Sequence, residues 1–252
     1  LFTDFAERQK CQLHELTNHQ SPFVFSVSQI IEFIKQNQLD LFVLSNPNPL
    51  TGLEYSREHM RELVAAIHAQ TAAYVVCDAA DALRTSSISG NLVKEYPRYI
   101  ELGSFSKFYG MSGERIGYII CPVKLASHFE RNISPVMNLT PIVGARAALE
   151  DSAYLRRTQG VVQENFGLLQ KALLHHPRLG LVTPDPDLGV DHHCFAACIV
   201  DTSGAKDLFA RFAAVYMTPL NAGHYFGLPH AVRVNIASPE IPTLIQWLSQ
   251  FG

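Results

Sequence analysis

The sequence predicts an α/β protein with a mostly parallel sheet sandwiched by helices, followed by a small α+β C-terminal domain. Three neighbouring segments carry this prediction. Leu41 to Leu44 is a short apolar run typical of a strand buried on both faces. Four apolar residues between 60 and 67 then recur at i, i+3, i+4 and i+7 behind the expected cap Ser56. Ala73 to Cys77 is a second buried-strand run, and this alternation predicts crossover connections between parallel strands.

The remaining elements are expected on both sides of this unit. Before it we expect a strand over 12–16 and a helix over 28–36, with Ser28 as the N-cap. After it, a long alanine-rich helical pattern runs over 140–176, with a weak point at Gly160. The segments that follow predict strands over 181–182, 194–200 and 232–236 and helices over 205–216 and from 239 onward. We therefore divide the chain into a large domain, 1–139, and a linking helix with a small domain, 140–252.

The composition is that of a globular protein and excludes several classes of function. The chain has 252 residues, 47% of them hydrophobic and 17% charged. A net charge of −3 gives no basic surface for nucleic acid or an anionic membrane. The five cysteines lie mostly in apolar runs, which indicates reduced core thiols and a cytoplasmic protein. The pairs His175-His176 and His192-His193 fit no zinc spacing, so no metal is expected.

One stretch, Gly103 to Tyr118, holds the chemistry. It lies between the apolar runs 99–102 and 116–121, so we expect a loop between two buried strands. Lys107 follows two serines in this loop, and such a lysine suits a Schiff-base role. Arg115 comes eight residues later, expected on the next strand, where a guanidinium suits a phosphate.

The stretch resembles the S-x-S-K-x-x-x-x-x-G-x-R-x-G signature of the class I/II, fold type I aminotransferases, which hold pyridoxal 5'-phosphate (PLP) on that lysine. The resemblance runs from Phe2 to the end of the chain and is strongest to the group of histidinol-phosphate aminotransferase and threonine-phosphate decarboxylase. It implies a homodimer that acts on an α-amino acid and a 2-keto acid. It also implies that a helical arm and a phosphate-binding turn, which precede Leu1 in the family, are missing from this chain.

The resemblance assigns the two catalytic residues and the ring contacts. Lys107 would form the Schiff base with PLP and carry the proton shift during transamination. Asp78 matches the aspartate of the family's D-x-A-Y motif, whose carboxylate keeps the pyridine nitrogen protonated. Phe2 matches the aromatic residue that stacks on the pyridine ring.

The same resemblance assigns the anion-binding residues. Ser104, Ser106 and Arg115 would hold the cofactor phosphate. Arg233 matches the small-domain arginine that grips the substrate α-carboxylate.

Two positions depart from the family pattern. The family turn N-P-x-N-P-T-G reads Asn46 to Gly52 here and places Pro49 where an asparagine donates to the phenolic oxygen of PLP. Asn48 could replace that donor if the turn shifts by one residue, and it would then also contact substrate. The tyrosine of D-x-A-Y, the second donor to this oxygen, is Asp81. A carboxylate can only accept hydrogen bonds, so both donors are altered together.

We therefore expect a PLP-dependent aminotransferase that works through Lys107. Two alternatives on the same fold stay open: a PLP-dependent decarboxylase or lyase, and a non-catalytic sensor domain. A member that has lost cofactor binding is a third, for which Pro49 and Asp81 are the argument.

Overall fold

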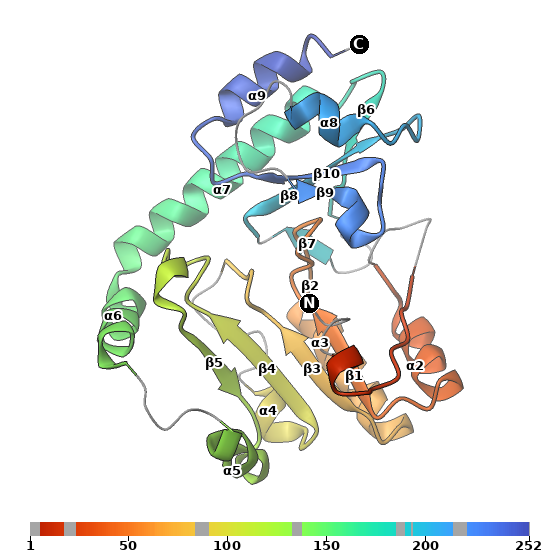
Figure 1. Ribbon diagram of the computed structural model, residues 1–252, viewed down its shortest axis with the longest axis vertical. Helices are drawn as coiled ribbons and strands as arrows, with labels where there is room; N and C mark the ends of the chain where they lie inside the picture. Colours follow the sequence, from red (N-terminus) through yellow and green to blue (C-terminus); the bar gives the residue numbers. More distant parts are fainter. Residues whose placement is uncertain are drawn as a thin grey trace.

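The computed structural model describes residues 6–17, 24–83, 91–132, 138–184, 190–192, 194–213 and 221–251. Figure 1 shows one sheet with its helices in the lower part of the molecule, a second sheet in the upper part, and the long helix α7 running along one side between them. No helix in these ranges is long and apolar enough to cross a membrane.

The first sheet has the strand order β1-β3-β4-β5. Its strands are β1 (Leu41–Ser45), β3 (Tyr74–Asp78), β4 (Tyr99–Ser104) and β5 (Gly117–Ile120). The first three are parallel, and β5 pairs antiparallel with β4 at the edge. The helices of this part are α2 (Val27–Gln36), α3 (Arg57–Gln70), α4 (Leu92–Glu95) and α5 (Val123–Asn132). The predicted mostly parallel α/β sheet is confirmed.

Helix starts in this part follow their caps. Ser26, not Ser28, begins α2, because its hydroxyl accepts from the Gln29 amide while the Gln29 side chain accepts from the Ser26 amide. Ser56 caps α3 as predicted, through a bond from the His59 amide. The predicted apolar stripe of α3 is confirmed, and its four residues are fully buried: Met60, Leu63, Val64 and Ile67.

Strand β5 differs from the expected buried strand. Tyr118 and Ile119 are each about two-fifths exposed, at 40% and 39%. The strand lies at the edge of the sheet, so an apolar run here does not mean burial. The expected strand over 12–16 also does not form: these residues have no regular structure, and Leu13 is exposed.

The expected helix over 140–176 is two helices, α6 (Leu139–Glu150) and α7 (Ser152–Leu173). The break is at Asp151, not at Gly160, because the Asp151 carboxylate accepts from the Tyr154 amide and so caps a new helix. Helix α7 continues through Gly160, held by five buried apolar residues along its length.

The second sheet has the order β6-β8-β10-β9 and is antiparallel. Its strands are β6 (Leu179–Leu181), β8 (Ala196–Asp201), β9 (Asn221–Ala222) and β10 (Ala231–Asn235), accompanied by α8 (Leu208–Ala213), η3 (Gly223–Phe226) and α9 (Ile241–Leu248). The elements predicted here are confirmed to within about three residues at the ends that are described. The expected end of the helix over 205–216 lies outside the described residues.

Several contacts join the two sheets. A two-stranded ladder pairs β2 (Leu53–Tyr55) with β7 (Val190–His192). Ala82, after β3, makes an antiparallel bridge with Cys194, and the Gln159 side chain of α7 donates to the Leu83 carbonyl at 2.8 Å. Phe108, after β4, is 1% exposed and packs in the core of the second sheet. The loops after the parallel strands are therefore fixed against the second sheet.

All five cysteines are free.

Gly52 offers a test of this junction. It has φ of +75°, and a Cβ there would overlap the Ala196 carbonyl oxygen of β8 and the His192 ring of β7, whereas Gly204 has φ of +78° and open space around it. We expect Gly204→Ala to cost about 1–2 kcal/mol of unfolding free energy for the left-handed backbone. Gly52→Ala should cost about 1–3 kcal/mol more, because the overlap must also be relieved. Urea denaturation of both variants measures the difference; equal losses would mean that Gly52 and Ala196 are not in contact.

Candidate functional site

The parallel strands bring three polar segments to one edge of the first sheet. Ser45 pairs with Asp78, and Asp78 pairs with Leu102. The Asn46 amide donates to the Asp78 carbonyl at 2.9 Å, so the register continues past the end of β1. Asp78 therefore lies in the middle of this edge, between the turn after β1 and the loop that carries Lys107. Ligands of parallel sheets bind at the carboxyl ends of the strands.

Asp78 is the half-buried carboxylate of this edge. Its Oδ1 accepts from the Ala80 amide at 3.0 Å. Burial raises the pKa of Asp78 above its usual value, the Ala80 bond opposes that rise, and the negative charge of Asp81 adds to it. The folded protein thus disfavours the ionised form of Asp78 unless a cation comes to it.

Lys107 faces a second carboxylate, that of Asp81. Lys107 Nζ lies 3.9 Å from Asp81 Oδ1, within ion-pair range but too far for a hydrogen bond. The lysine side chain is 48% exposed and the aspartate side chain 17% exposed. Aromatic residues on either side fix the backbone: Phe105 packs on Tyr109 and Tyr118, while Phe108 is buried under the second sheet. The lysine is thus presented from a rigid loop.

The three residues predicted to hold a phosphate lie within twelve positions of one another in the chain, 104 to 115. Ser104 Oγ accepts from the Ser106 amide at 3.0 Å, which shapes the turn before Lys107. Arg115 is not on the next strand as expected. It ends the 3-10 turn η1 (Ser112–Glu114) with φ of 52°, and its exposed guanidinium donates to the Ser112 carbonyl at 3.1 Å. The ladder between β4 and β5 begins only at Gly117, which pairs with Ser104, so Arg115 belongs to the loop before it.

The turn after β1 is organised by Asn48. Its Oδ1 accepts from the amides of Leu50 and Thr51, at 2.9 and 3.0 Å. The oxygen of Asn48 therefore shapes the turn, and its NH₂ group is the part that could donate to a ligand. Asn46, which sequence reasoning placed only at a strand end, is buried and bonds the Tyr55 backbone, so it closes the same turn from the other side.

Arg233 reaches this turn from the second sheet. It lies on β10, and its Nε donates to the Pro49 carbonyl at 2.5 Å. Sequence reasoning saw Pro49 only as a lost donor and missed the carbonyl, although every proline keeps this acceptor. The structure therefore brings Asn48, Lys107, Asp78, Asp81 and Arg233 to one junction. Phe2 lies outside the described residues.

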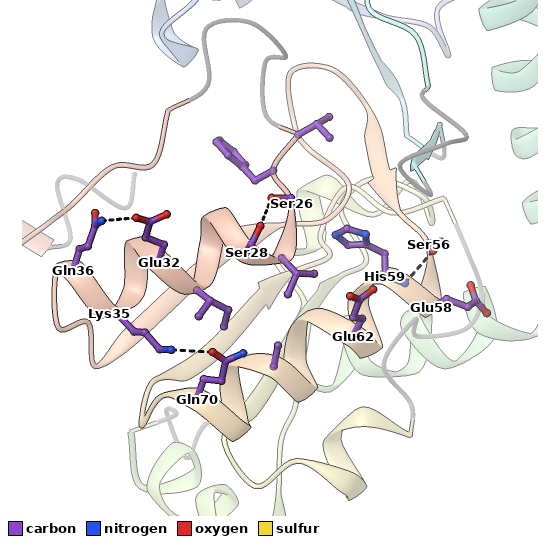
Figure 2. Close-up of a pocket in the computed structure, with 15 residues that line it drawn as sticks. Ser26, Ser28, Glu32, Lys35, Gln36, Ser56, Glu58, His59, Glu62 and Gln70 are labelled. Carbon is purple, nitrogen blue, oxygen red and sulfur yellow. Dashed lines mark hydrogen bonds between the residues drawn. The ribbon is translucent and has the colours of Figure 1, made fainter.

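Cavities in the described part of the chain include one of about 1120 Å³, which is not this junction. It lies between α2 and α3, and Figure 2 shows carboxylates of both helices along it, while Lys35 donates to Gln70 at 2.8 Å. Its lining has three glutamates and one lysine and includes none of the predicted site residues, so its charge does not favour a phosphate. A smaller cavity, of about 400 Å³, lies between the glycines of the Lys107 loop and α6. No cluster of metal-binding side chains is found in the described residues.

Comparison with known proteins agrees with this geometry. The family model of class I and II aminotransferases matches residues 6–246. Histidinol-phosphate aminotransferase 2 of Archaeoglobus fulgidus is 32% identical over 142 residues, 56% of this chain and 40% of that protein. Histidinol-phosphate aminotransferase of Symbiobacterium thermophilum is 28% identical over 204 residues, 79% of this chain and 53% of that protein. The chain thus spans about half the length of these relatives, or less.

A solved structure matches almost the whole length of this chain. The histidinol-phosphate aminotransferase from Clostridium acetobutylicum superposes with a TM-score of 0.83 at 16% sequence identity, over 99% of this chain and 74% of that one. The sheet order, the lysine loop at the carboxyl edge and the match over residues 6–246 lead to one conclusion: the chain belongs to the class I and II aminotransferase family.

Proposed function

We propose that this chain carries the cofactor and substrate site of a PLP-dependent aminotransferase, moving an amino group between an α-amino acid and a 2-keto acid. The observation that supports it best is the junction itself. Lys107 is presented from a rigid loop at the carboxyl edge beside Asp78 and Asp81, and Arg233 reaches the same edge from the second sheet. We also propose a homodimeric, cytoplasmic enzyme with a domain division at 139/140.

The residues present fit PLP. Asp78 is a half-buried carboxylate whose pKa is raised by burial, so a cationic pyridine nitrogen would be a favourable partner for it. Ser104, Ser106 and Arg115 would hold the phosphate, with Arg115 supplying the positive charge. Asn48 is the remaining amide donor at the turn, and Phe2 would lie against the ring. When bound, PLP supplies an aldehyde that condenses with amines and a ring that withdraws electrons from the substrate.

The chain's own groups then divide the work. Asp78 keeps a proton on the ring nitrogen. Lys107 is the attachment point and, once its amine is free, the base that takes and returns the proton at the substrate α-carbon. Arg233 orients the substrate: Pro49 holds Nε, so the η nitrogens are left as a paired fork for the α-carboxylate. Catalysis would thus rest on groups from both sheets.

Attachment at Lys107 is tested by borohydride reduction of the protein with PLP, followed by peptide mapping. We expect the label on Lys107 and its loss in Lys107→Arg, while the exposed control Lys124→Arg keeps it. Adding an L-amino acid before reduction should instead convert the cofactor to its amine form and release a keto acid. Carbon dioxide in place of keto acid would contradict an aminotransferase.

Arg233→Ala should weaken binding of α-amino acids by about 2–5 kcal/mol, because a desolvated carboxylate would lose its partner. The corresponding amines without a carboxylate serve as the control and should bind almost unchanged. Binding is measured by titration of the cofactor absorbance. A loss of the same size for both kinds of ligand would assign Arg233 a purely structural role in holding Pro49.

Asp78→Asn should make the cofactor-free protein more stable at neutral pH. The folded-state pKa of Asp78 is raised, so its contribution to stability is fully present below the usual aspartate pKa and is lost as pH rises through the folded value. Asparagine does not ionise, so Asp78→Asn should have a higher free energy of unfolding than the parent near neutral pH. The difference should vanish in acid, where Asp78 is protonated. Denaturation from pH 3.5 to 8 measures it, with exposed Asp40→Asn as the control. A variant less stable than the parent at neutral pH would show that Asp78 already has a cation.

A further inference from the structure

Asp81 has a buried oxygen for which the described residues supply no hydrogen bond. Its Oδ1 is buried and has no donor among them, and it is this oxygen that lies 3.9 Å from Lys107 Nζ. A buried carboxylate oxygen without a donor is costly, so the approach of a cation to it lowers the free energy of the folded state.

The backbone that carries Asp81 is held in place on both sides. Asp81 lies in a turn closed by a bond from the Ala82 amide to the Ala79 carbonyl, at 3.1 Å. The next residues are held from the second sheet by the Ala82–Cys194 bridge and by Gln159, which donates to Leu83. Lys107, with its four-carbon stem and half-exposed side chain, is the mobile member of the pair.

The other charges around Asp81 leave Lys107 as its partner. Asp78 is of like sign, and the Asp81 charge adds to the raised pKa of Asp78. Burial raises the pKa of Cys194 to about 12; Asp81 adds to that rise, and Arg233 opposes it, so both charges reach the same thiol. Arg233, however, is held by Pro49, and the ion pair of Asp81 within the described residues is with Lys107.

We propose that Asp81 is a positioning residue for Lys107, acting as the counter-ion of its side-chain nitrogen. Asp81 directs the amine of Lys107 to the carboxyl edge of the sheet through their ion pair. The family signature has a tyrosine hydroxyl at this position, which donates to a cofactor oxygen. Asp81 can only accept, so its negative charge is balanced by the nitrogen of Lys107 instead. The ion pair is inferred from the distance between Lys107 and Asp81 and from the burial of Asp81. Its role in catalysis rests on the proposed function.

The test measures how readily Lys107 reacts, without cofactor. The protein is treated with trace amounts of a neutral acylating reagent, and labelling of Lys107 is compared by mass spectrometry with that of exposed Lys94 and Lys124 in the same sample. An ammonium ion has no lone pair, so a counter-ion slows acylation. We expect Asp81→Asn to speed labelling of Lys107 about two- to fivefold, the range of partly exposed ion pairs. Asp81→Glu should restore the slow rate, and Asp40→Asn should leave it unchanged.

Salt supplies a readout that a structural role would not move. Raising the salt concentration should speed labelling of Lys107 in the parent protein and have little effect in Asp81→Asn, because screening weakens only an existing pair. An unchanged Lys107 rate in Asp81→Asn, a parallel change at all three lysines, or no restoration by glutamate would overturn the proposal.

The same variants separate this proposal from the proposed function. Each is also incubated with PLP, reduced with borohydride and mapped. Label on Lys107 together with an Asp81-independent acylation rate would refute the counter-ion and leave the cofactor lysine standing. No PLP label on Lys107 in any variant, with the acylation pattern as expected, would refute the cofactor lysine and leave the pair.

Discussion

The in-register pairing of three parallel strands is the constraint on which the rest of the structure depends. Because β1, β3 and β4 run in the same direction, each leaves its following loop at one edge of the sheet. The second sheet is attached to those same loops, by the Arg233 bond to Pro49, the Ala82 bridge to Cys194 and the buried ring of Phe108. The candidate site therefore lies among the residues that join the first sheet to the second.

This arrangement concentrates uncompensated charge where the two sheets join. Asp78 is half buried with a raised pKa, Asp81 has a buried oxygen to which no described residue donates, and Lys107 Nζ lies 3.9 Å from that oxygen. Such groups lower the stability of the protein alone, since desolvated charges need partners. Under the proposed function, the ring nitrogen of PLP and the carboxylate of a substrate would supply such partners. Strain of this kind gathers at binding sites because the ligand relieves it.

The sequence identified the parts of this site that depend on local pattern. The lysine loop, Asp78 at a strand end and the α3 stripe could be predicted because strand periodicity and parallel topology place them without further information. The assignment of roles to Lys107, Asp78 and Arg233 stays a prediction. Contacts between distant segments could not be read: Pro49 accepts from Arg233 through its backbone, and a carbonyl has no residue-specific signal.

Other differences have equally physical causes. β5 is apolar yet exposed, because the burial of an edge strand is decided by what packs on its face and not by its own residues. The break between α6 and α7 depends on the Asp151 side chain turning back on its own backbone, a cap that outweighed the more obvious Gly160.

Phe108 has a mechanical consequence for the residue before it. Lys107 follows β4 of the first sheet. The ring of the next residue, Phe108, is 1% exposed and packs in the core of the second sheet. A hinge motion that separates the halves would have to withdraw this ring into water, at about 1.5–3 kcal/mol, or drag Lys107 along with it. The backbone position of Lys107 is therefore tied to both halves of the protein through the ring of the residue that follows it.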